Sequence, residues 1–306
     1  MSRPAVLFVS PISRELQSLL APAYDLRFLT AATDLAELAD VRAIVGHHPI
    51  GDALLDACPK AGYVNSFAAG YENVDLARLG REGRILCTTP GASAEEVADT
   101  AALLVLAGLK RLRDLDALVR SGRWVTEGQP PPRRGLGGTH VGVVGAGAVG
   151  QAILRRMGAF GAVLHYHARN PREIDATYHP SLIGLAARCE VLILAMPGGP
   201  ETRNAVDREV LEALGPEGTL INLARGSVVD EPALIAALAS GALGFAALDV
   251  FATEPEVPAA LRALPNTLFT PHYAGASLQA RLRKGQMLID SMGAYFAGRD
   301  VPYRIT

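Results

Sequence analysis

The stretch 141–172, VGVVGAGAVGQAILRRMGAFGAVLHYHARNPR, decides the fold of this chain. It opens with a short β-branched apolar run, 141–144, which is typical of a buried parallel strand. Gly145, Gly147 and Gly150 follow at once. In this spacing the first glycine permits a tight turn, the second lets backbone approach a pyrophosphate, and the third lets the next helix pack closely. Glycine-rich turns also occur in many other folds.

The residues after the glycines make a nucleotide site the better interpretation. A helix over 148–160 and a second strand over 163–167 complete a βαβ unit in the required order. The helix would begin at Ala148 and Val149, where free N–H groups and the positive end of the helix dipole can bind phosphates. The sequence therefore predicts a dinucleotide-binding domain.

The end of the second strand indicates which dinucleotide is bound. An NAD site usually places Asp or Glu there to bind the ribose 2′-hydroxyl, whereas an NADP site supplies an arginine. This chain has His167, Ala168, Arg169 and Asn170, with no carboxylate before Glu173. A guanidinium can bind a 2′-phosphate through paired charge-assisted hydrogen bonds. We therefore expect NADPH, with NADH as the secondary cofactor; the alternative is that Arg169 is only a solvated surface charge.

Composition describes an ordered globular protein. The chain has 306 residues, of which 49% are apolar and 20% charged, which is enough for two domains with separate cores. A net charge of −2 argues against a nucleic-acid or polybasic membrane surface. We expect a soluble cytoplasmic protein with no signal peptide and no membrane span. No metal site is predicted, because the three cysteines are widely spaced.

Both halves of the chain alternate strands with helices, which predicts parallel sheets. Five strand candidates precede the glycine turn: 5–9, 26–29, 43–45, 63–64 and 85–87. Four more follow the βαβ unit, giving six strands in outline for the dinucleotide fold: 191–195, 220–223, 245–248 and 267–269. One long helical pattern spans 94–118 and another 277–297. The prediction is an α/β protein of two doubly wound domains, 1–98 with 284–306 for substrate and 99–283 for the dinucleotide.

Three reactive side chains follow the late strands. Arg225, Glu254 and His272 each come just after a strand end, the edge where open α/β sheets bind ligands. Arg225 could hold a substrate carboxylate and polarise a ketone, and His272 could protonate the ketone oxygen during hydride transfer. Glu254 could bond the other imidazole nitrogen, fix its tautomer and raise its pKa. Each residue alone has a structural explanation; their shared position favours a catalytic one.

Six motifs carry a resemblance to a known family: AGYENVD (69–75), EEVAD (95–99), GAGAVG (145–150), NLARGSVVDEPAL (222–234), ALDVFATEPEVP (247–258) and TPHYAG (270–275). Over nearly the whole chain they resemble the D-isomer-specific 2-hydroxyacid dehydrogenase family, and the last three are highly specific. Ala168 departs from the commonest pattern, where NAD-using relatives carry Asp. With Arg169 it is similar to the NADPH-preferring glyoxylate and hydroxypyruvate reductase branch.

The resemblance implies a Rossmann-type cofactor domain, a smaller flavodoxin-like substrate domain, an active-site cleft between them, and usually a homodimer built on the cofactor domains. Arg225, Glu254 and His272 are implied as catalytic residues, and Arg225 and His272 also as substrate residues. Backbone amides at Ala69 and Gly70 would bind the substrate carboxylate. Asp249 would bond the nicotinamide carboxamide. Further cofactor contacts are implied at Pro197, Leu223, Ala224, Arg225, His272 and Ala274.

These features predict an enzyme that reduces a small 2-keto acid, glyoxylate or hydroxypyruvate, to the D-hydroxy acid with NADPH. The small loop of the first domain supplies no obvious arginine for a phosphorylated or second acidic group, which disfavours phosphoglycerate. Two alternatives stay open: NAD-linked oxidation of another D-2-hydroxy acid by the same residues, and a non-catalytic NAD(P)H-sensing protein similar to the transcriptional corepressors of this family.

Overall fold

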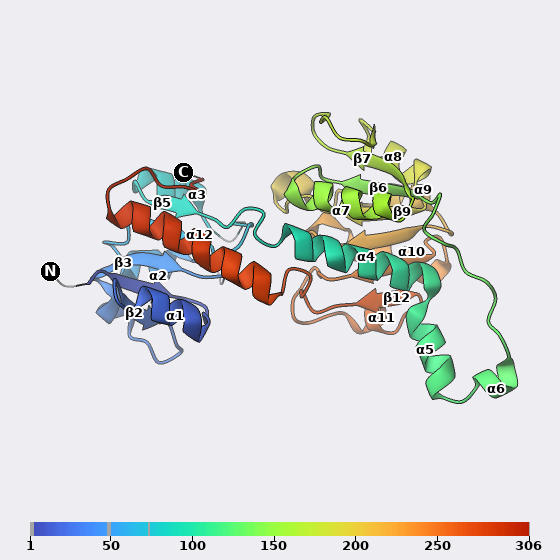
Figure 1. Cartoon of the computed structure of the whole chain (residues 1–306), viewed down its shortest axis with the longest axis horizontal. Coiled ribbons are helices and arrows are strands. Elements are labelled where there is room, and N and C mark those ends of the chain that lie inside the picture. Colours follow the sequence, from blue (N-terminus) through green and yellow to red (C-terminus); the bar gives the residue numbers. More distant parts are fainter. Residues whose placement is uncertain (1–2, 48–49, 73, 306) are drawn as a thin grey trace. The chain divides into compact units, whose positions relative to one another are not determined.

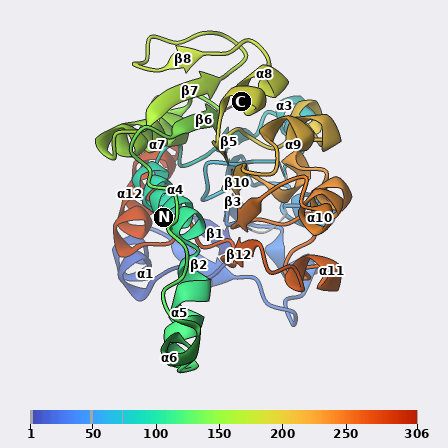
Figure 2. The same cartoon turned by 90° about the vertical axis from the view of Figure 1, so that its right-hand side faces the viewer.

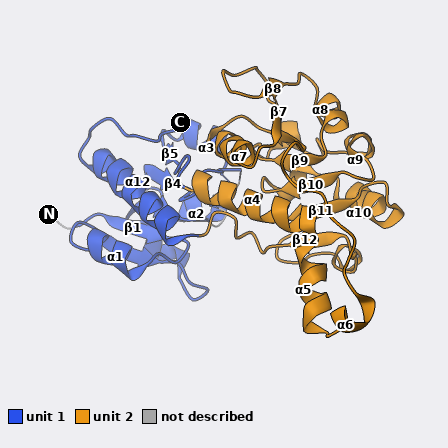
Figure 3. Cartoon of the chain, turned by 45° about the vertical axis from the view of Figure 1, so that its right-hand side comes forward, with its two compact units in different colours: residues 1–92, 277–306 blue, residues 93–276 orange. Residues whose placement is uncertain are grey.

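A computed structural model describes residues 3–47, 50–72 and 74–305. Two compact units divide the chain: unit 1 comprises 1–92 and 277–306, and unit 2 comprises 93–276 (Figure 3). The predicted boundaries at 98/99 and 283/284 lie six and seven residues further along the chain. The reason is that whole helices stay with one unit: α4 (Ala94–Lys110) belongs to unit 2 and α12 (Leu278–Phe296) to unit 1.

Unit 1, coloured blue in Figure 3, holds a five-stranded parallel sheet of order β2-β1-β3-β4-β5. Its strands are β1 (Ala5–Phe8), β2 (Asp25–Phe28), β3 (Val41–Val45), β4 (Tyr63–Asn65) and β5 (Ile85–Cys87). The helices are α1 (Arg14–Leu20), the 3₁₀ turn η1 (Leu35–Leu38), α2 (Asp52–Ala57), α3 (Leu76–Arg81) and α12. One core lies between the sheet and α1 with α12, the other between the sheet and α2 with α3. Helices on both faces make this a doubly wound domain.

Unit 2 holds a seven-stranded parallel sheet of order β12-β11-β10-β9-β6-β7-β8. Its strands are β6 (His140–Val144), β7 (Val163–His167), β8 (Thr177–Tyr178), β9 (Val191–Leu194), β10 (Thr219–Asn222), β11 (Phe245–Leu248) and β12 (Thr267–Phe269). Strand β8, which pairs with β7 at the sheet edge, adds a seventh strand to the six expected. It is only two residues long, too short to leave a pattern in the sequence.

Helices cover both faces of the second sheet (Figure 2). Helices α4 and α7 (Ala148–Ala159) share one core, and α8 (Leu182–Arg188), α9 (Arg208–Leu214) and α10 (Glu231–Ser240) share the other. The remaining helical segments are α5 (Leu112–Arg120), α6 (Trp124–Glu127), α11 (Ala259–Arg262), and the 3₁₀ turns η2 (Pro200–Thr202) and η3 (Gly226–Val228). The doubly wound α/β fold predicted for both halves of the chain is confirmed.

The expected single helix over 94–118 is wrong, because it breaks at Arg111. This residue has a left-handed backbone, φ 52°, which ends α4 and starts α5 in a new direction. Its side chain lies 4.5 Å from the Phe245 ring centre and donates to the Gly244 carbonyl at 3.1 Å. These tertiary contacts compensate for a backbone conformation that a side chain other than glycine rarely adopts. Among the described residues, no helix is long and apolar enough to cross a membrane.

Candidate active site

The glycine turn after β6 has the geometry that its spacing predicts. Gly145 has φ 105°, and a Cβ there would lie 2.8 Å from the Ala195 carbonyl oxygen. A Cβ on Gly150 would lie 1.8 Å from the Gly145 carbonyl oxygen, so α7 packs against the turn only because this residue is glycine. Gly147, just before α7, would have no atom within 4 Å of an added Cβ. The space before Ala148 and Val149 is therefore open, and the amides of the first turn lack intrahelical acceptors.

The end of β7 has an exposed arginine and no acid. Ala168 packs against the core shared with α7, and its carbonyl accepts the Tyr178 hydroxyl at 3.3 Å. The Arg169 side chain is 87% exposed, with Nη1 3.6 Å from the Glu201 carboxylate, itself 82% exposed. Such solvated ion pairs contribute little stability, so this guanidinium is readily turned to a ligand. Asn170 is exposed beside it.

The loop after β9 carries Pro197, which is exposed. Its carbonyl accepts the Thr202 hydroxyl at 2.9 Å, so the 3₁₀ turn η2 closes back on Pro197. The same turn brings Glu201 beside Arg169. The ends of β7 and β9 thus lie at the carboxyl edge where the glycine turn also lies.

Arg225 lies in a loop that the buried Asn222 at the end of β10 holds in place. The Asn222 side chain accepts from the Ala224 N–H and donates to the Arg225 carbonyl, both at 3.0 Å. A Cβ on Gly226 would lie 1.8 Å from the Phe251 carbonyl oxygen, which brings this loop against the chain after β11. The Arg225 guanidinium is half-buried, and Nη1 donates to the Ala224 carbonyl at 2.7 Å.

Glu254 and His272 form the hydrogen bond that the sequence predicts. The Glu254 Oε2 lies 2.7 Å from His272 Nδ1, and Oε1 accepts the Phe251 N–H at 3.0 Å. With one oxygen fixed by backbone, the carboxylate presents the other to the imidazole. An ionised carboxylate only accepts, so Nδ1 carries a proton and Nε2 is the nitrogen left for a reacting group. The His272 side chain is 52% exposed and can be reached by a ligand.

Asp249, at the end of β11, organises the loop that carries His272. Its buried carboxylate accepts the Thr270 hydroxyl at 2.6 Å, the Tyr273 N–H at 2.8 Å and the Ala274 N–H at 3.0 Å. Its carbonyl accepts the His272 N–H at 2.7 Å. His272 has a left-handed backbone, φ 51°, which these bonds stabilise. The sequence motifs contain Asp249 and Thr270, but only the folded loop shows that they hold His272.

Adjacent strands bring these groups to one edge of the sheet. Arg225 follows β10, Glu254 follows β11 and His272 follows β12, and these three strands are neighbours. The Asp249 N–H donates to the Asn222 carbonyl at 3.0 Å, which connects the first two loops directly. Leu223 and Ala224 are buried within the first loop, and Ala274 within the last.

Ala69 and Gly70 belong to unit 1, in the loop after β4. Asn73 of the same motif lies outside the described residues. Ala69 is exposed and Gly70 half-buried. Within the part of the chain that the structure describes, neither N–H donates a hydrogen bond. Two adjacent amides of this kind are suited to binding an anion.

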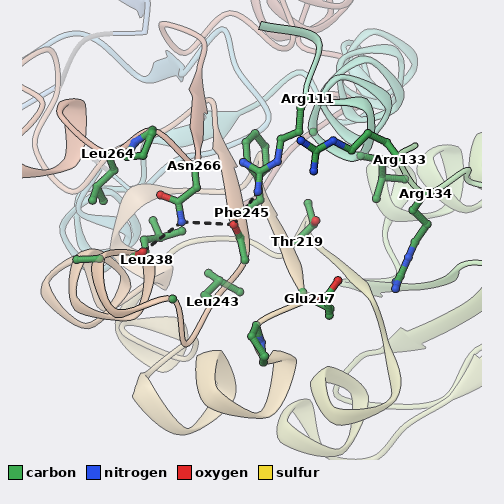
Figure 4. Close-up of a pocket in the computed structure, with 18 of the residues that line it drawn as sticks. Arg111, Arg133, Arg134, Glu217, Thr219, Leu238, Leu243, Phe245, Leu264 and Asn266 are labelled. Atoms are coloured by element: carbon green, nitrogen blue, oxygen red, sulfur yellow. Dashed lines mark hydrogen bonds between the residues drawn. The ribbon is translucent and has the colours of Figure 1, made fainter. Parts of the chain in front are cut away.

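A large cavity lies at the opposite edge of the second sheet (Figure 4). It has a volume of about 830 Å³, and its lining includes the first residues of β10 and β11, Thr219 and Phe245. Arg111, Arg133 and Arg134 form one wall. Since parallel sheets bind ligands at the carboxyl ends of their strands, we do not assign this cavity to the reaction. Among described residues, no cluster of three His, Cys, Asp or Glu side chains is suited to a metal ion.

We predict that Asp249→Asn destabilises the loop. The amide would place an N–H group against a backbone N–H donor, leaving one buried donor unpaired at a cost of about 1–3 kcal/mol in the free energy of unfolding. Asp207→Asn is the matched control, because Asp207 caps α9 through one oxygen and asparagine caps equally well. Urea unfolding of both variants measures the difference; equal stabilities would contradict this role for Asp249.

Comparison with known proteins agrees with the geometry. Residues 102–274 match the family model described as D-isomer specific 2-hydroxyacid dehydrogenase, NAD binding domain. The chain is 37% identical to a hydroxyphenylpyruvate reductase of Plectranthus scutellarioides and 36% identical to a glyoxylate/hydroxypyruvate reductase of Arabidopsis thaliana; each match covers 98% of both chains.

A solved structure shares the whole fold. It is an NADPH-dependent glyoxylate/hydroxypyruvate reductase of Sinorhizobium meliloti in complex with NADP and malonate, 39% identical, with a TM-score of 0.93. The match covers 100% of this chain and 97% of that one. The chain therefore belongs to the D-isomer-specific 2-hydroxyacid dehydrogenase family, as its motifs indicated.

Proposed function

We propose that this protein reduces a small 2-keto acid to the D-2-hydroxy acid with NADPH. The observation that carries the proposal is the 2.7 Å bond between Glu254 Oε2 and His272 Nδ1, at the sheet edge that also carries the glycine turn. It leaves an exposed imidazole whose Nε2 is available for proton transfer. The similarity to the NADPH-dependent glyoxylate/hydroxypyruvate reductase of Sinorhizobium meliloti supports the assignment.

The nucleotide-binding residues fit NADPH. The open space at Gly147 and the start of α7 suit a pyrophosphate, and Arg169 suits a 2′-phosphate. Asn170, Pro197, Leu223, Ala224 and Ala274 are the further contacts that we propose. We propose that Asp249 bonds the nicotinamide carboxamide. Its carboxylate has about four acceptor positions, of which the loop uses three, so one is left for this bond. NADH is the weaker cofactor in this proposal, because Ala168 offers no carboxylate to its ribose 2′-hydroxyl.

The chain's own residues would divide the reaction among them. Arg225 binds the substrate carboxylate and polarises the ketone oxygen. When bound, NADPH supplies the hydride that reduces the carbonyl carbon. The proton on His272 Nε2 passes to the ketone oxygen, which becomes the hydroxyl, and Glu254 stabilises the imidazolium before transfer and keeps the neutral ring in the correct tautomer. The amides of Ala69 and Gly70 bind the substrate carboxylate as well.

We propose glyoxylate and hydroxypyruvate as substrates, because the Arabidopsis and Sinorhizobium relatives are both glyoxylate/hydroxypyruvate reductases. The Plectranthus relative is a hydroxyphenylpyruvate reductase, so this larger aromatic keto acid should be assayed as well. Loss of NADPH absorbance with each keto acid measures the preference. No turnover of any of them would favour an NAD(P)H-sensing protein instead, and turnover only of D-hydroxy acids with NAD would favour the oxidative alternative.

We also propose a cytoplasmic homodimer built on unit 2. Helices α5 and α6 extend away from the sheet (Figure 1) and expose apolar side chains, including Trp124 and Val125, the latter 91% exposed. Exposed apolar surface of this kind marks protein interfaces. Light scattering should give twice the chain mass, and Val125→Asp should shift it toward the monomer. A wild-type monomer would contradict this assembly.

His272→Asn is predicted to lower kcat by about 10²–10⁴, the range of a lost general acid. Glu254→Gln should also lower kcat, since the amide no longer fixes the proton on Nδ1, and should leave the Kd of NADPH unchanged. Glu256→Gln, which removes a charge two residues away, is the control. Steady-state kinetics of the three proteins check this, and an unchanged kcat for Glu254→Gln would count against the pair.

Arg169→Asp is predicted to weaken NADPH binding by about tenfold or more and NADH binding far less, because only NADPH carries the 2′-phosphate that the guanidinium binds. Arg208→Asp is the control, since the Arg208 side chain is similarly exposed, 81%, on α9. Fluorescence titration gives both dissociation constants. Equal losses for NADPH and NADH would mean that Arg169 is only a surface charge.

A further inference from the structure

A chain of buried hydrogen bonds in unit 1 runs from α12 to the loop that carries Ala69 and Gly70. Asn65, Tyr63 and Ser291 are all buried. The Asn65 amide nitrogen lies 2.9 Å from the Tyr63 hydroxyl, which lies 2.7 Å from the Ser291 hydroxyl. Ser291 in turn donates to the Met287 carbonyl at 2.8 Å. None of these side chains has a role in the reaction proposed above.

The Phe67 N–H fixes the orientation of the Asn65 amide. A backbone N–H only donates, so the Asn65 oxygen faces Phe67 and the NH₂ group faces the Tyr63 hydroxyl, to which it donates. Burial raises the pKa of Tyr63 well above its ordinary value, which keeps the hydroxyl protonated. The Tyr63 and Ser291 hydroxyls share the next hydrogen bond, and the Met287 carbonyl connects Ser291 to α12.

That oxygen fixes the start of the loop. Asn65 Oδ1 accepts the Phe67 N–H at 2.7 Å. Phe67 has a left-handed backbone, φ 50°, which a side chain with a Cβ adopts only when its surroundings hold it there. Two residues on, the chain reaches Ala69 and Gly70. The Ala68 carbonyl is held from the other side by the Thr89 N–H at 2.8 Å and the Ser66 hydroxyl at 3.0 Å.

We propose that Asn65 is a positioning residue for substrate, which sets the direction of the Ala69 and Gly70 amides by holding Phe67 in its left-handed conformation. Tyr63 and Ser291 hold the Asn65 amide in the required orientation. The inference rests on the proposed function, in which these two amides bind the keto-acid carboxylate. Asn65 acts on substrate binding and not on the proton transfer, for which Glu254 and His272 suffice.

Asn65→Leu removes the acceptor while keeping the side-chain size. We expect it to raise KM for the preferred keto acid by about tenfold or more. The kcat at saturation and the Kd of NADPH should stay within about threefold of wild type, because the substrate and the transition state lose the same binding energy. Malonate, a dicarboxylate that reacts with neither cofactor form, should lose competitive inhibition in parallel. An unchanged KM in a folded Asn65→Leu protein would overturn the proposal.

Two further variants separate positioning from general destabilisation. Asn65→Asp keeps an acceptor for the Phe67 N–H and, when protonated in this buried site, a donor for Tyr63; it should keep KM near the wild-type value even where Tm falls. Tyr63→Phe frees the Asn65 amide to turn and should raise KM less than Asn65→Leu does. If Asn65→Leu does not fold, the Tyr63→Phe result decides, and no KM change there contradicts the inference.

Leu20→Ala is the matched control. Leu20 is buried in the same core as Tyr63, on α1, and its truncation lowers Tm while leaving the hydrogen bonds from Asn65 to Tyr63 and Phe67 in place. A rise in KM that follows Tm across Leu20→Ala and the Asn65 variants would show a merely structural effect and overturn the proposal. If the wild-type protein reduces no keto acid, both the proposed function and this inference are contradicted. If the wild-type protein reduces keto acids and Asn65→Leu has an unchanged KM, only this inference is contradicted.

Discussion

The hydrogen bond from His272 Nδ1 to Glu254 is the interaction on which the proposed chemistry depends. An isolated histidine has two tautomers and a free ring, so it offers a proton in no fixed direction. Here the Glu254 carboxylate accepts the Nδ1–H, with 2.7 Å between Oε2 and Nδ1, and its other oxygen accepts the Phe251 N–H. The ring can then exchange a proton only through Nε2. Asp249 and Thr270 hold the loop that carries His272, and the proposed cofactor and substrate residues lie at the same edge of the sheet.

A buried carboxylate supports that pair from behind. Asp249 accepts hydrogen bonds from one hydroxyl and two backbone amides of the loop 270–274. These bonds let His272 adopt a left-handed backbone that glycine would otherwise be needed for. In unit 1, the Asn65 side chain accepts from the Phe67 N–H, and Phe67 likewise has a left-handed backbone. In both places a buried polar side chain at the end of a strand accepts from the next loop and fixes a strained residue. Both loops carry groups that we assign to the substrate, which is where stored backbone strain is expected.

The sequence predicted the fold class and the residues that line the sheet edge, because both leave local patterns. Gly145 and Gly150 are required by backbone contacts a few residues away, and Arg225, Glu254 and His272 follow strands that apolar runs reveal. Long-range contacts left no such pattern. The break at Arg111 depends on Phe245 and Gly244, and the Arg169 ion pair depends on Glu201. The chain from Ser291 to Asn65 joins residues more than two hundred positions apart.

The most direct measurement of the central claim is ¹⁵N NMR of His272 in the free protein, with Glu254→Gln as reference. The account predicts that the neutral ring carries its proton on Nδ1, hydrogen-bonded to Glu254, and that Nε2 carries none. Loss of the Nδ1–H preference in Glu254→Gln would complete the result. A neutral His272 protonated on Nε2 would contradict the account.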